Sequence, residues 1–546
     1  MRARKQPRTL RNCTFKKRLK LAACCSVLVF YSSCSRINLN CAPGDVSCSP
    51  LAWMMTLYSR SLNAQPCGGI GFNASSFHSY LSSGLSMQGN ALCALKDGGL
   101  VAVGETDTGT TLQGKAPLIA HSGSAGDAMV VKWDSGGNVE WFTYLGTGSS
   151  NLRFDKIAET AAGGVVLLGY MNGPDNFVIG GKSPILPATS GDDTDIYIAL
   201  LRADGSLAWH TALGGGASGN EYDNGGVVVA GDGSIYISGT AGSGAPATMG
   251  SVTASVPFTA GDGNNIIFAK LSADGTLLHF RYIGGGGTGG SYYGLSLAAS
   301  GDGFVIAGDA LNSPQNTIDG HAAILPFTAG DDRENLAVKV DPGGNILWLT
   351  YLGGGGAANV YNHAATASLH DGSVIVAANS TTGINTIGGL GALIPFSSSD
   401  GLIFKLSPSG QLQWFTYLGG GSALYTLSDV RQAADGGILT GGSSQDGVSS
   451  MGGVTERAPC GGATNCTFLA KLGTSGNLEW FTHASAGAGS TYAFQGIAPA
   501  ADGGLLGIGY AQNGASTLQG RTPLNPFQAG DTYDLFMMKV DLEGRL

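Results

Sequence analysis

Acidic residues gather at three places in this 546-residue chain, and they are the first residues that could bind a metal ion or take part in a reaction. Calcium prefers carboxylate oxygens and needs several of them from one short loop. The candidate ligands are Asp192, Asp193, Asp195, Asp331, Asp332 and Asp531. Neither an EF-hand pattern nor another compact acidic loop surrounds them. The sequence therefore predicts no metal site, and we interpret these acids as turn formers and as an acid that recurs at the start of a strand.

Histidines are the second candidates for chemistry. Eight are present at positions that are not equivalent, and His121, His321 and His363 lie in or near long connecting segments. No GxSxG or HExxH motif accompanies them, and the sequence pairs none of them with a nucleophile. The sequence therefore predicts neither a catalytic constellation nor a cofactor.

Six of the ten cysteines follow Cys34, and an even six in an exported chain allows fifteen disulfide connectivities. Cys460 and Cys466 are the expected pair, because they bracket one loop of a single repeat. Zinc would need CxxC pairs or histidines at ligand spacing, and neither occurs. Two GGGG runs, 284–287 and 353–356, lack the Lys-Ser/Thr of a phosphate loop, so we interpret them as flexible crossings between repeats.

The elements that carry these residues repeat along the chain. A strand-like run ending in WFTYLG, or a near copy, closes units of 64 to 71 residues; the copies begin at Trp141, Trp209, Phe280, Trp348, Trp414 and Trp480. An earlier copy, Phe77–Leu81, stands alone before the first unit, and the last unit stops at Leu546 without a copy of its own. Six whole units and two complementary parts make seven, so the first strand is expected to complete the last sheet.

Each unit contains four short strand signals in a fixed order. The first two strands flank an Asp-Gly turn, which tolerates the positive φ angles of tight hairpins. These turns are Asp97-Gly98, Asp302-Gly303, Asp371-Gly372, Asp435-Gly436 and Asp502-Gly503. A long segment with the loose pattern TLQG…PL…AGD leads to a third strand with a Lys near its end, and a second glycine turn precedes the WFTYL strand.

Four antiparallel strands per unit without a helical period indicate an all-β propeller or a β-solenoid. Ring closure explains the two incomplete ends of the repeat region, and it hides sheet edges that would otherwise invite aggregation. The predicted fold is therefore a seven-bladed β-propeller of four-stranded antiparallel blades over residues 77–546, closed by an N-terminal strand that completes the last blade.

The units resemble the bacterial SBBP repeat, a β-propeller repeat. The resemblance rests on an acid before an F-x-x-K-type strand, as in Asp400–Lys405 and Asp534–Lys539, and on a terminal YLG, as in Tyr144–Gly146, Tyr351–Gly353 and Tyr417–Gly419. Two units depart from the pattern: the third has Arg281-Tyr282-Ile283 in place of T-Y-L, and the sixth has Cys466 in place of the acid. The resemblance implies the propeller fold and export, and no common reaction.

The first 34 residues are typical of a bacterial secretion signal. Residues 1–20 carry nine Lys or Arg and no acid, and an uncharged stretch of small and apolar residues follows to Cys34. Tyr31-Ser32-Ser33-Cys34 resembles a lipobox, apart from Tyr31 in place of the usual Leu. We expect a signal peptide over 1–33, lipidation of Cys34 and a tether over 34–76. An ordinary secreted chain and an uncleaved anchor remain the alternatives.

The net charge of the chain after residue 20 indicates which classes of partner it can bind. Beyond residue 20 the chain has 20 Lys and Arg against 38 Asp and Glu, a balance that repels nucleic acid. Long loops on one face of the ring are the expected binding face. We expect a monomeric, lipid-anchored protein of the bacterial envelope, in the outer membrane or at the cell surface. Its propeller would bind or scaffold a protein or glycan without being an enzyme. The alternatives are a lyase or glycosidase acting on a polysaccharide at the central channel, and a purely structural component.

Overall fold

The computed structural model describes Cys67 and residues 76–546, apart from 83–85, 110, 124–125, 149–150, 173–176, 189–193, 216–221, 287–288, 356–359, 501 and 529. These residues belong to one compact part, Tyr58–Leu546. Strands, turns and loops make up the described residues of this part. No helix long and apolar enough to cross a bilayer occurs among the residues described.

Five separate four-stranded antiparallel sheets account for most of the strands. The first unit contains β2 (Met87–Ala94), β3 (Leu100–Thr106), β4 (Asp127–Trp133) and β5 (Val139–Leu145). The second contains β6 (Asn151–Glu159), β7 (Val165–Asn172), β8 (Asp195–Leu201) and β9 (Leu207–Leu213). The fifth contains β23 (Tyr361–Ser368), β24 (Val374–Ser380), β27 (Asp400–Leu406) and β28 (Leu412–Leu418). The sixth contains β29 (Leu424–Gln432), β30 (Ile438–Gln445), β33 (Cys466–Leu472) and β34 (Leu478–Ala484). The last contains β35 (Thr491–Pro499), β36 (Leu505–Gln512), β37 (Asp534–Val540) and β1 (Phe77–Leu81).

The third and fourth units share one nine-stranded sheet, because the two-residue strand β16 (Ser291–Tyr292) pairs with both. The third unit contributes β10 (Tyr222–Val229), β11 (Ile235–Gly242), β14 (Asn264–Leu271) and β15 (Leu277–Ile283). The fourth contributes β17 (Ser296–Ser300), β18 (Gly303–Leu311), β21 (Arg333–Val340) and β22 (Ile346–Leu352). Short ribbons occur in four long segments: β12 (Thr248–Met249) with β13 (Val252–Thr253), β19 (Thr317–Ile318) with β20 (His321–Ala322), β25 (Thr386–Ile387) with β26 (Leu390–Gly391), and β31 (Ser450–Met451) with β32 (Val454–Thr455).

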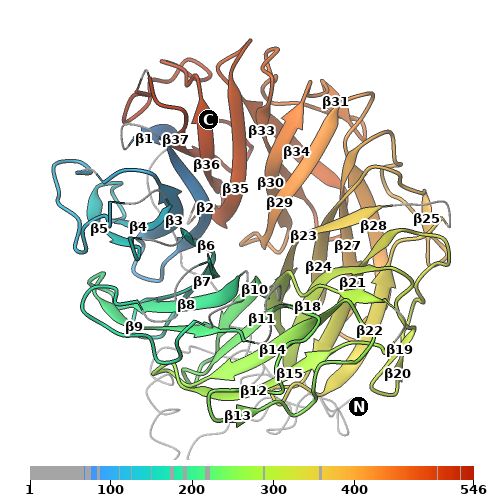
Figure 1. Cartoon of the computed structure of the whole chain (residues 1–546). Helices are drawn as coiled ribbons and strands as arrows, with labels where there is room; N and C mark the ends of the chain where they lie inside the picture. The colour runs from blue at the N-terminus through green and yellow to red at the C-terminus, as the bar shows by residue number, and fades with distance from the viewer. Residues whose placement is uncertain are drawn as a thin grey trace, which may run out of the picture. The chain divides into compact units, whose positions relative to one another are not determined.

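The prediction of an all-β propeller with four-stranded antiparallel blades is confirmed. The separate blades number five rather than the predicted seven, since the third and fourth units are joined by β16. Figure 1 shows the sheets arranged around a common centre, with β2, β6, β10, β23, β29 and β35 nearest the middle. The innermost strand of every unit therefore borders the central channel.

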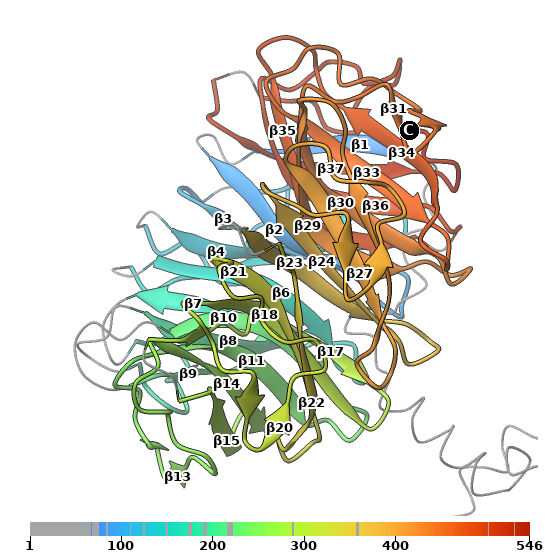
Figure 2. The same ribbon diagram turned by 90° about the vertical axis from the view of Figure 1, so that its right-hand side faces the viewer.

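The two ends of the described chain lie in one sheet. β1 pairs antiparallel with β37 from Phe77 opposite Lys539 to Leu81 opposite Leu535. Figure 2 shows this early strand, in blue, among the red strands of the last unit. The expected pairing of the first strand with the last sheet is confirmed, and β1 occupies the place that WFTYL strands hold in the other units.

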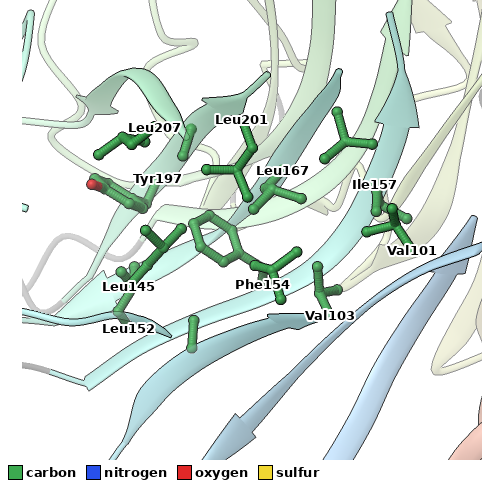
Figure 3. Close-up of a cluster of buried hydrophobic side chains, with 14 of the residues drawn as sticks. Val101, Val103, Leu145, Leu152, Phe154, Ile157, Leu167, Tyr197, Leu201 and Leu207 are labelled. Atoms are coloured by element: carbon green, nitrogen blue, oxygen red, sulfur yellow. The ribbon is translucent and has the colours of Figure 1, made fainter. Parts of the chain in front are cut away.

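Hydrophobic side chains fill the space between neighbouring sheets. Figure 3 shows one such cluster between the first and second units, in which Val101 and Val103 of β3 meet Phe154 of β6 and Leu167 of β7. Burial of apolar surface of this kind contributes roughly 25 cal/mol per Å². Sheet-to-sheet contact in the ring therefore depends on alternate side chains of each strand.

The repeated tryptophan fastens one unit to the next. Trp141 lies against Gly205 in the second glycine turn of the next unit, and its indole N–H donates a hydrogen bond to the carbonyl of Ala203 at 2.9 Å. Trp209 and Trp348 repeat the bond with Ala273 and Pro408 at 3.1 and 3.0 Å. In the third unit His279 holds the tryptophan position, so the repeat there starts at His279 and not at Phe280. Arg281 of that unit donates to the carbonyl of Gly344 instead.

The long segment of each unit covers the exposed edge of the outermost strand. In the first unit Leu118 donates its N–H to the carbonyl of Phe142, and Tyr144 donates to Ile119. Equivalent pairs recur in the other units, including the last, where Leu524 donates to His78 and Tyr80 to Asn525. Much of this segment therefore lies along the side of the ring rather than on the predicted binding face, and it blocks edge-to-edge association.

A β-bulge interrupts the inner strand of most units at the same level. The extra residues are Asn90, Asp155, Ala364, Ser428 and Gln495. The bulge pushes a carbonyl of the inner strand toward the second strand, where a glycine stands opposite. A β-carbon on Gly169 would lie 1.7 Å from the carbonyl oxygen of Arg153, and one on Gly104 would lie 1.9 Å from that of Gln88. Glycine stands opposite four of these five bulges, while the fifth unit has Ala378 there.

Gly169→Ala is expected to destabilise the fold by about 1–3 kcal/mol, because the inner strand must shift to admit the methyl group. Chemical denaturation monitored by fluorescence measures this change in the free energy of unfolding. Gly391→Ala is the matched control, since a β-carbon there meets no atom within 4 Å. Equal stability of the two variants would contradict the proposed role of the glycine.

Candidate functional site

The central channel is lined by polar side chains at the end where the inner strands begin. A cavity of about 450 Å³ occupies this mouth, and every unit contributes to its wall. Its polar lining residues are Asn90, Arg153, Asp155, Lys156, Tyr170, Asp223, Asn224, His363, Asn379, Ser428 and Gln495. A β-bulge changes the direction in which the side chains of its strand point. The bulge residues that line the cavity are Asn90, Asp155, Ser428 and Gln495.

Arg153 is the centre of a charge cluster at this mouth. Its Nε donates to Oδ1 of Asp155 at 2.6 Å, and its Nη1 lies 3.4 Å from Oε1 of Glu105 in the first unit. The three side chains are 22 to 34% exposed. Arg153 and Asp155 line the mouth cavity, whereas Glu105 lies on the side of Arg153 that faces away from it. Two carboxylates from different units are thus fixed on one guanidinium without touching each other.

Burial and neighbouring charges shift the pKa values of this cluster in opposite directions. Burial raises the pKa of Glu105, and the neighbouring Arg153 opposes this rise without cancelling it. Burial also raises the pKa of Tyr170, again against the effect of Arg153. Desolvation opposes the charge of Arg153, but its contacts with Asp155 and Glu105 outweigh desolvation and raise its pKa. The protonated form of Glu105 therefore persists to a higher pH than that of an ordinary glutamate.

A groove leads outward from the channel between the first and second units. This second cavity of about 360 Å³ shares Arg153 and Tyr170 with the channel mouth. Its remaining polar lining consists of Ser86, Gln88, Glu105, Thr106, Asp107, Asn151 and Asn172. The Arg153 cluster therefore stands where groove and channel meet. Amides, hydroxyls and carboxylates on a rigid rim form a lining suited to hydroxyl-rich ligands.

His363 is the one predicted candidate histidine that reaches the channel. Its Nε2 lies 2.7 Å from Oγ of Ser296, and its backbone N–H donates to Asp309 at 2.7 Å. His363 is half-buried and lines the channel, and its desolvation lowers the pKa of its imidazole to about 3, with a smaller contribution from Lys156. Burial also raises the pKa of Asp309 to about 7. His363 is therefore a neutral wall residue.

The other two candidate histidines lie away from the channel. His121 accepts a bond from the N–H of Gly123 and lies beside Asp127, so it shapes a loop. His321 is exposed on the ribbon strand β20. Neither contributes to a site with other ionisable side chains.

The calcium candidates do not gather into a site. No group of three or more potential metal ligands occurs within the described part of the chain. Asp192 and Asp193 lie outside the described residues, Asp332 is exposed, and Asp195 is buried at the start of β8. Asp331 and Asp531 each lie beside an acid that begins a third strand, Glu334 and Asp534.

These strand-start acids anchor the long segments. Asp127 and Asp400 accept backbone N–H bonds from Ser122 and Ser397 at 2.6 and 2.8 Å. The glycine of YLG leaves room for the acid, because a β-carbon on Gly146 would lie 1.8 Å from Asp127. Burial raises the pKa of Glu334 to about 8 and that of Asp534 to about 7. The repeated acid and the repeated YLG glycine are thus one structural device.

The GGGG run of the third unit surrounds a carboxylate of the protein itself. Oδ2 of Asp262 accepts N–H bonds from Gly285 and Gly286 at 3.0 and 3.3 Å. Successive backbone N–H groups form such anion-binding hollows. Because Asp262 fills this one, the run serves the fold at this position.

Two disulfides are present in the described chain. Cys460 pairs with Cys466, which replaces the strand-start acid of the sixth unit, so a covalent bond anchors that unit's long segment. Cys67 pairs with Cys93 of β2, a connection that sequence reasoning did not select among the fifteen possibilities. Cys34, the signal peptide and nearly all of the tether lie outside the described residues.

Comparison of the chain with known proteins finds similar solved structures and no related sequence. No protein-family model matches it, and no curated protein does. It is similar in structure to the polysaccharide lyase Uly1, with 10% identity, 83% of this chain and 90% of that chain covered, and a TM-score of 0.41. It is also similar to an ulvan lyase, with 11% identity, coverages of 81% and 92%, and a TM-score of 0.38. It is similar as well to an α-L-arabinofuranosidase of Fusarium graminearum, with 10% identity, 86% of this chain and 98% of that chain covered, and a TM-score of 0.36.

The prediction of a binding or scaffolding module without enzymatic activity is wrong. That prediction required a channel without convergent ionisable groups, whereas Glu105, Arg153, Asp155 and Tyr170 meet at the channel mouth. Several of the similar solved structures carry the names of enzymes, among them polysaccharide lyases and a trans-sialidase. Sequence reasoning missed the cluster because its members come from three different strands. The bulge glycines, such as Gly104 and Gly169, were the available signal.

Neutral His363 makes the fold sensitive to acid. Its folded pKa lies below that of a free histidine, so the unfolded chain binds the proton first and stability falls as the pH drops from about 6.5 toward 3. His363→Gln is expected to lose less stability than the parent protein between pH 7 and pH 4 (roughly the window in which free histidine gains its proton). Urea midpoints at the two pH values measure the difference. An unchanged difference would contradict this assignment.

Proposed function

We propose that this protein is a glycosidase that cleaves a polysaccharide at the mouth of its central channel. The observation that carries the proposal is the Arg153 cluster, in which carboxylates of two units share one guanidinium at the junction of two cavities. Glycoside hydrolysis uses two carboxyl groups with different roles, one protonated and one ionised. Glu105 and Asp155 fit these roles, because burial keeps Glu105 protonated to a higher pH.

The proposed reaction is the addition of water across the glycosidic bond. Glu105 donates its proton to the leaving oxygen while the bond from that oxygen to the anomeric carbon breaks. Asp155 takes a proton from a water molecule, whose oxygen bonds to the anomeric carbon. Exchange with solvent then returns the proton to Glu105. Arg153 keeps the two carboxyl groups apart and oriented, which makes it a positioning residue.

The charges around the cluster favour hydrolysis over the lyase reaction. A lyase acts beside a substrate carboxylate, whose charge must be neutralised before a proton leaves the neighbouring carbon. Arg153 already contacts two protein carboxylates, and Asp107 adds a third acid to the groove. A negatively charged sugar would meet repulsion there.

Glu105→Gln is expected to lower kcat/KM on natural oligosaccharides by about 10²–10⁴-fold, because the leaving oxygen is no longer protonated. The loss should be much smaller on a dinitrophenyl glycoside, whose leaving group departs without a proton. Reducing-sugar release and dinitrophenolate absorbance measure the two rates. Glu543→Gln, an exposed acid in the last turn, is the matched control.

Two results would refute the assignment. One is unchanged activity of the Glu105→Gln variant on oligosaccharides. The other is an ultraviolet-absorbing unsaturated product, which hydrolysis does not form and elimination does.

The dependence of kcat/KM on pH should reflect the protonation of Glu105. The acid must be protonated, so kcat/KM falls as the pH rises through its pKa, which burial places above that of an ordinary glutamate. Arg153 lowers this pKa, so Arg153→Gln is expected to move the alkaline limb to higher pH as well as to reduce kcat. Initial rates across a pH series measure both effects. An alkaline limb that stays in place would exclude Glu105 as the titrating acid.

We also propose that the seven units form one closed ring. Support comes from the N–H of Met87, at the start of β2, which donates to the carbonyl of Tyr533 beside β37 at 2.9 Å. Side chains of the first and last units share one hydrophobic cluster, in which Leu92 meets Ile508 and Met537. These contacts repeat those between other neighbouring units.

Export and lipid anchoring at Cys34 remain part of the proposal, as do a monomeric state and a bacterial envelope location. The basic first 20 residues and the lipobox-like Tyr31–Cys34 support them. Cys34→Ala should release the protein from membranes. Continued membrane retention of that variant would exclude lipidation there.

A further inference from the structure

The channel narrows sharply below its mouth. The mouth cavity of about 450 Å³ lies within the range of small-molecule sites, roughly 300–1,000 Å³. The next cavity has a volume of about 60 Å³, and its wall comes from positions further along the same inner strands. On β6, for example, Arg153 lines only the mouth, whereas Ile157 lines only the deeper cavity.

The floor of the mouth consists of side chains shared by both cavities. Asn90, Asp155, Lys156, Ser428 and Gln495 line both, and all but Lys156 are bulge residues. Below them Asp429 and Arg431 form an ion pair at 2.8 Å. The space for a ligand thus falls from about 450 to about 60 Å³ at this level, which favours a ligand whose end lies in the mouth.

Charges at the mouth cancel. Arg153 and Lys156 are opposed by Asp155 and Asp223, and His363 is neutral near pH 7. The rest of the polar wall consists of amides and the hydroxyls of Tyr170 and Ser428, which pair with sugar hydroxyls through ordinary hydrogen bonds. An anionic sugar gains no net attraction in such a cavity.

We propose that the channel mouth holds the uncharged terminal sugars of a glycan chain, so that the enzyme works from the chain end and releases short products. The remainder of the chain lies in the groove between the first and second units, and the bond at the junction is the one that Glu105 and Asp155 flank. This inference rests on the proposed glycosidase activity and adds its mode of action and its class of substrate.

The product pattern tests the inference without any mutation. The full-length protein is incubated with linear neutral polysaccharides (glucan, mannan, xylan and arabinan), and products are followed by chromatography together with solution viscosity. Release of one short product from the outset, with viscosity falling slowly, is expected. A rapid fall in viscosity with products of many lengths would overturn the chain-end mode while leaving the glycosidase proposal intact. No cleavage of any glycan, neutral or charged, would overturn both.

A variant tests the location of the terminal sugars. Ser428→Trp places a large side chain on the floor of the mouth and is expected to reduce short-product release by at least about tenfold, since small displacements at a reacting centre have effects of this size. Ser475→Trp, in an exposed turn of the same unit, is the control. Thermal melting shows whether each variant is folded, and the milder Gln495→Ala should raise KM even if Ser428→Trp fails to fold. Preferential cleavage of uronate-containing or sulfated chains, or full activity of folded Ser428→Trp, would refute the inference.

Discussion

The close approach of two strands at one backbone position is the constraint on which the channel depends. In most units a carbonyl of the innermost strand lies where the β-carbon of the opposing residue would stand, so that residue is glycine, as at Gly104 and Gly169. This approach makes the bulge possible, and the bulge turns residues such as Asp155 and Gln495 toward the channel. In a strand without the bulge, successive side chains would point to opposite faces of the sheet. The polar residues of the mouth would then be divided between the two faces.

A second set of interactions holds the units in the positions that this wall requires. Trp141 and its equivalents lie on a glycine turn of the following unit, while buried acids such as Asp127 and Asp400 hold each long segment by its backbone N–H groups. The Arg153 cluster depends on both, because Glu105 and Asp155 belong to different units and meet only when two sheets are correctly placed. The geometry of this cluster, to which we assign the proposed reaction, is thus a property of the interface between sheets.

The fold was predictable from the sequence to a large extent, and the site was not. The WFTYL copies and Asp-Gly turns indicate four-stranded units, and the lone Phe77–Leu81 strand correctly indicates pairing with the last sheet. The merging of two units through β16 depends on a two-residue pairing with no sequence signal. The cluster was missed because Glu105 and Arg153 are 48 positions apart and neither stands in a catalytic motif. Their proximity follows only from the curvature of the ring, which a repeat pattern does not specify.

The composite last sheet has a consequence for biosynthesis. β1 is synthesised before all the other described strands, whereas its partner β37 is the last of them, so β1 stays unpaired until the units between the two strands have been made. Until then its buried residues have no neighbours, and the edge of β37 stays open once it appears. The other units form from contacts that are local in sequence, whereas this sheet needs a contact between strands that are far apart in the chain, a kind of pairing that forms slowly.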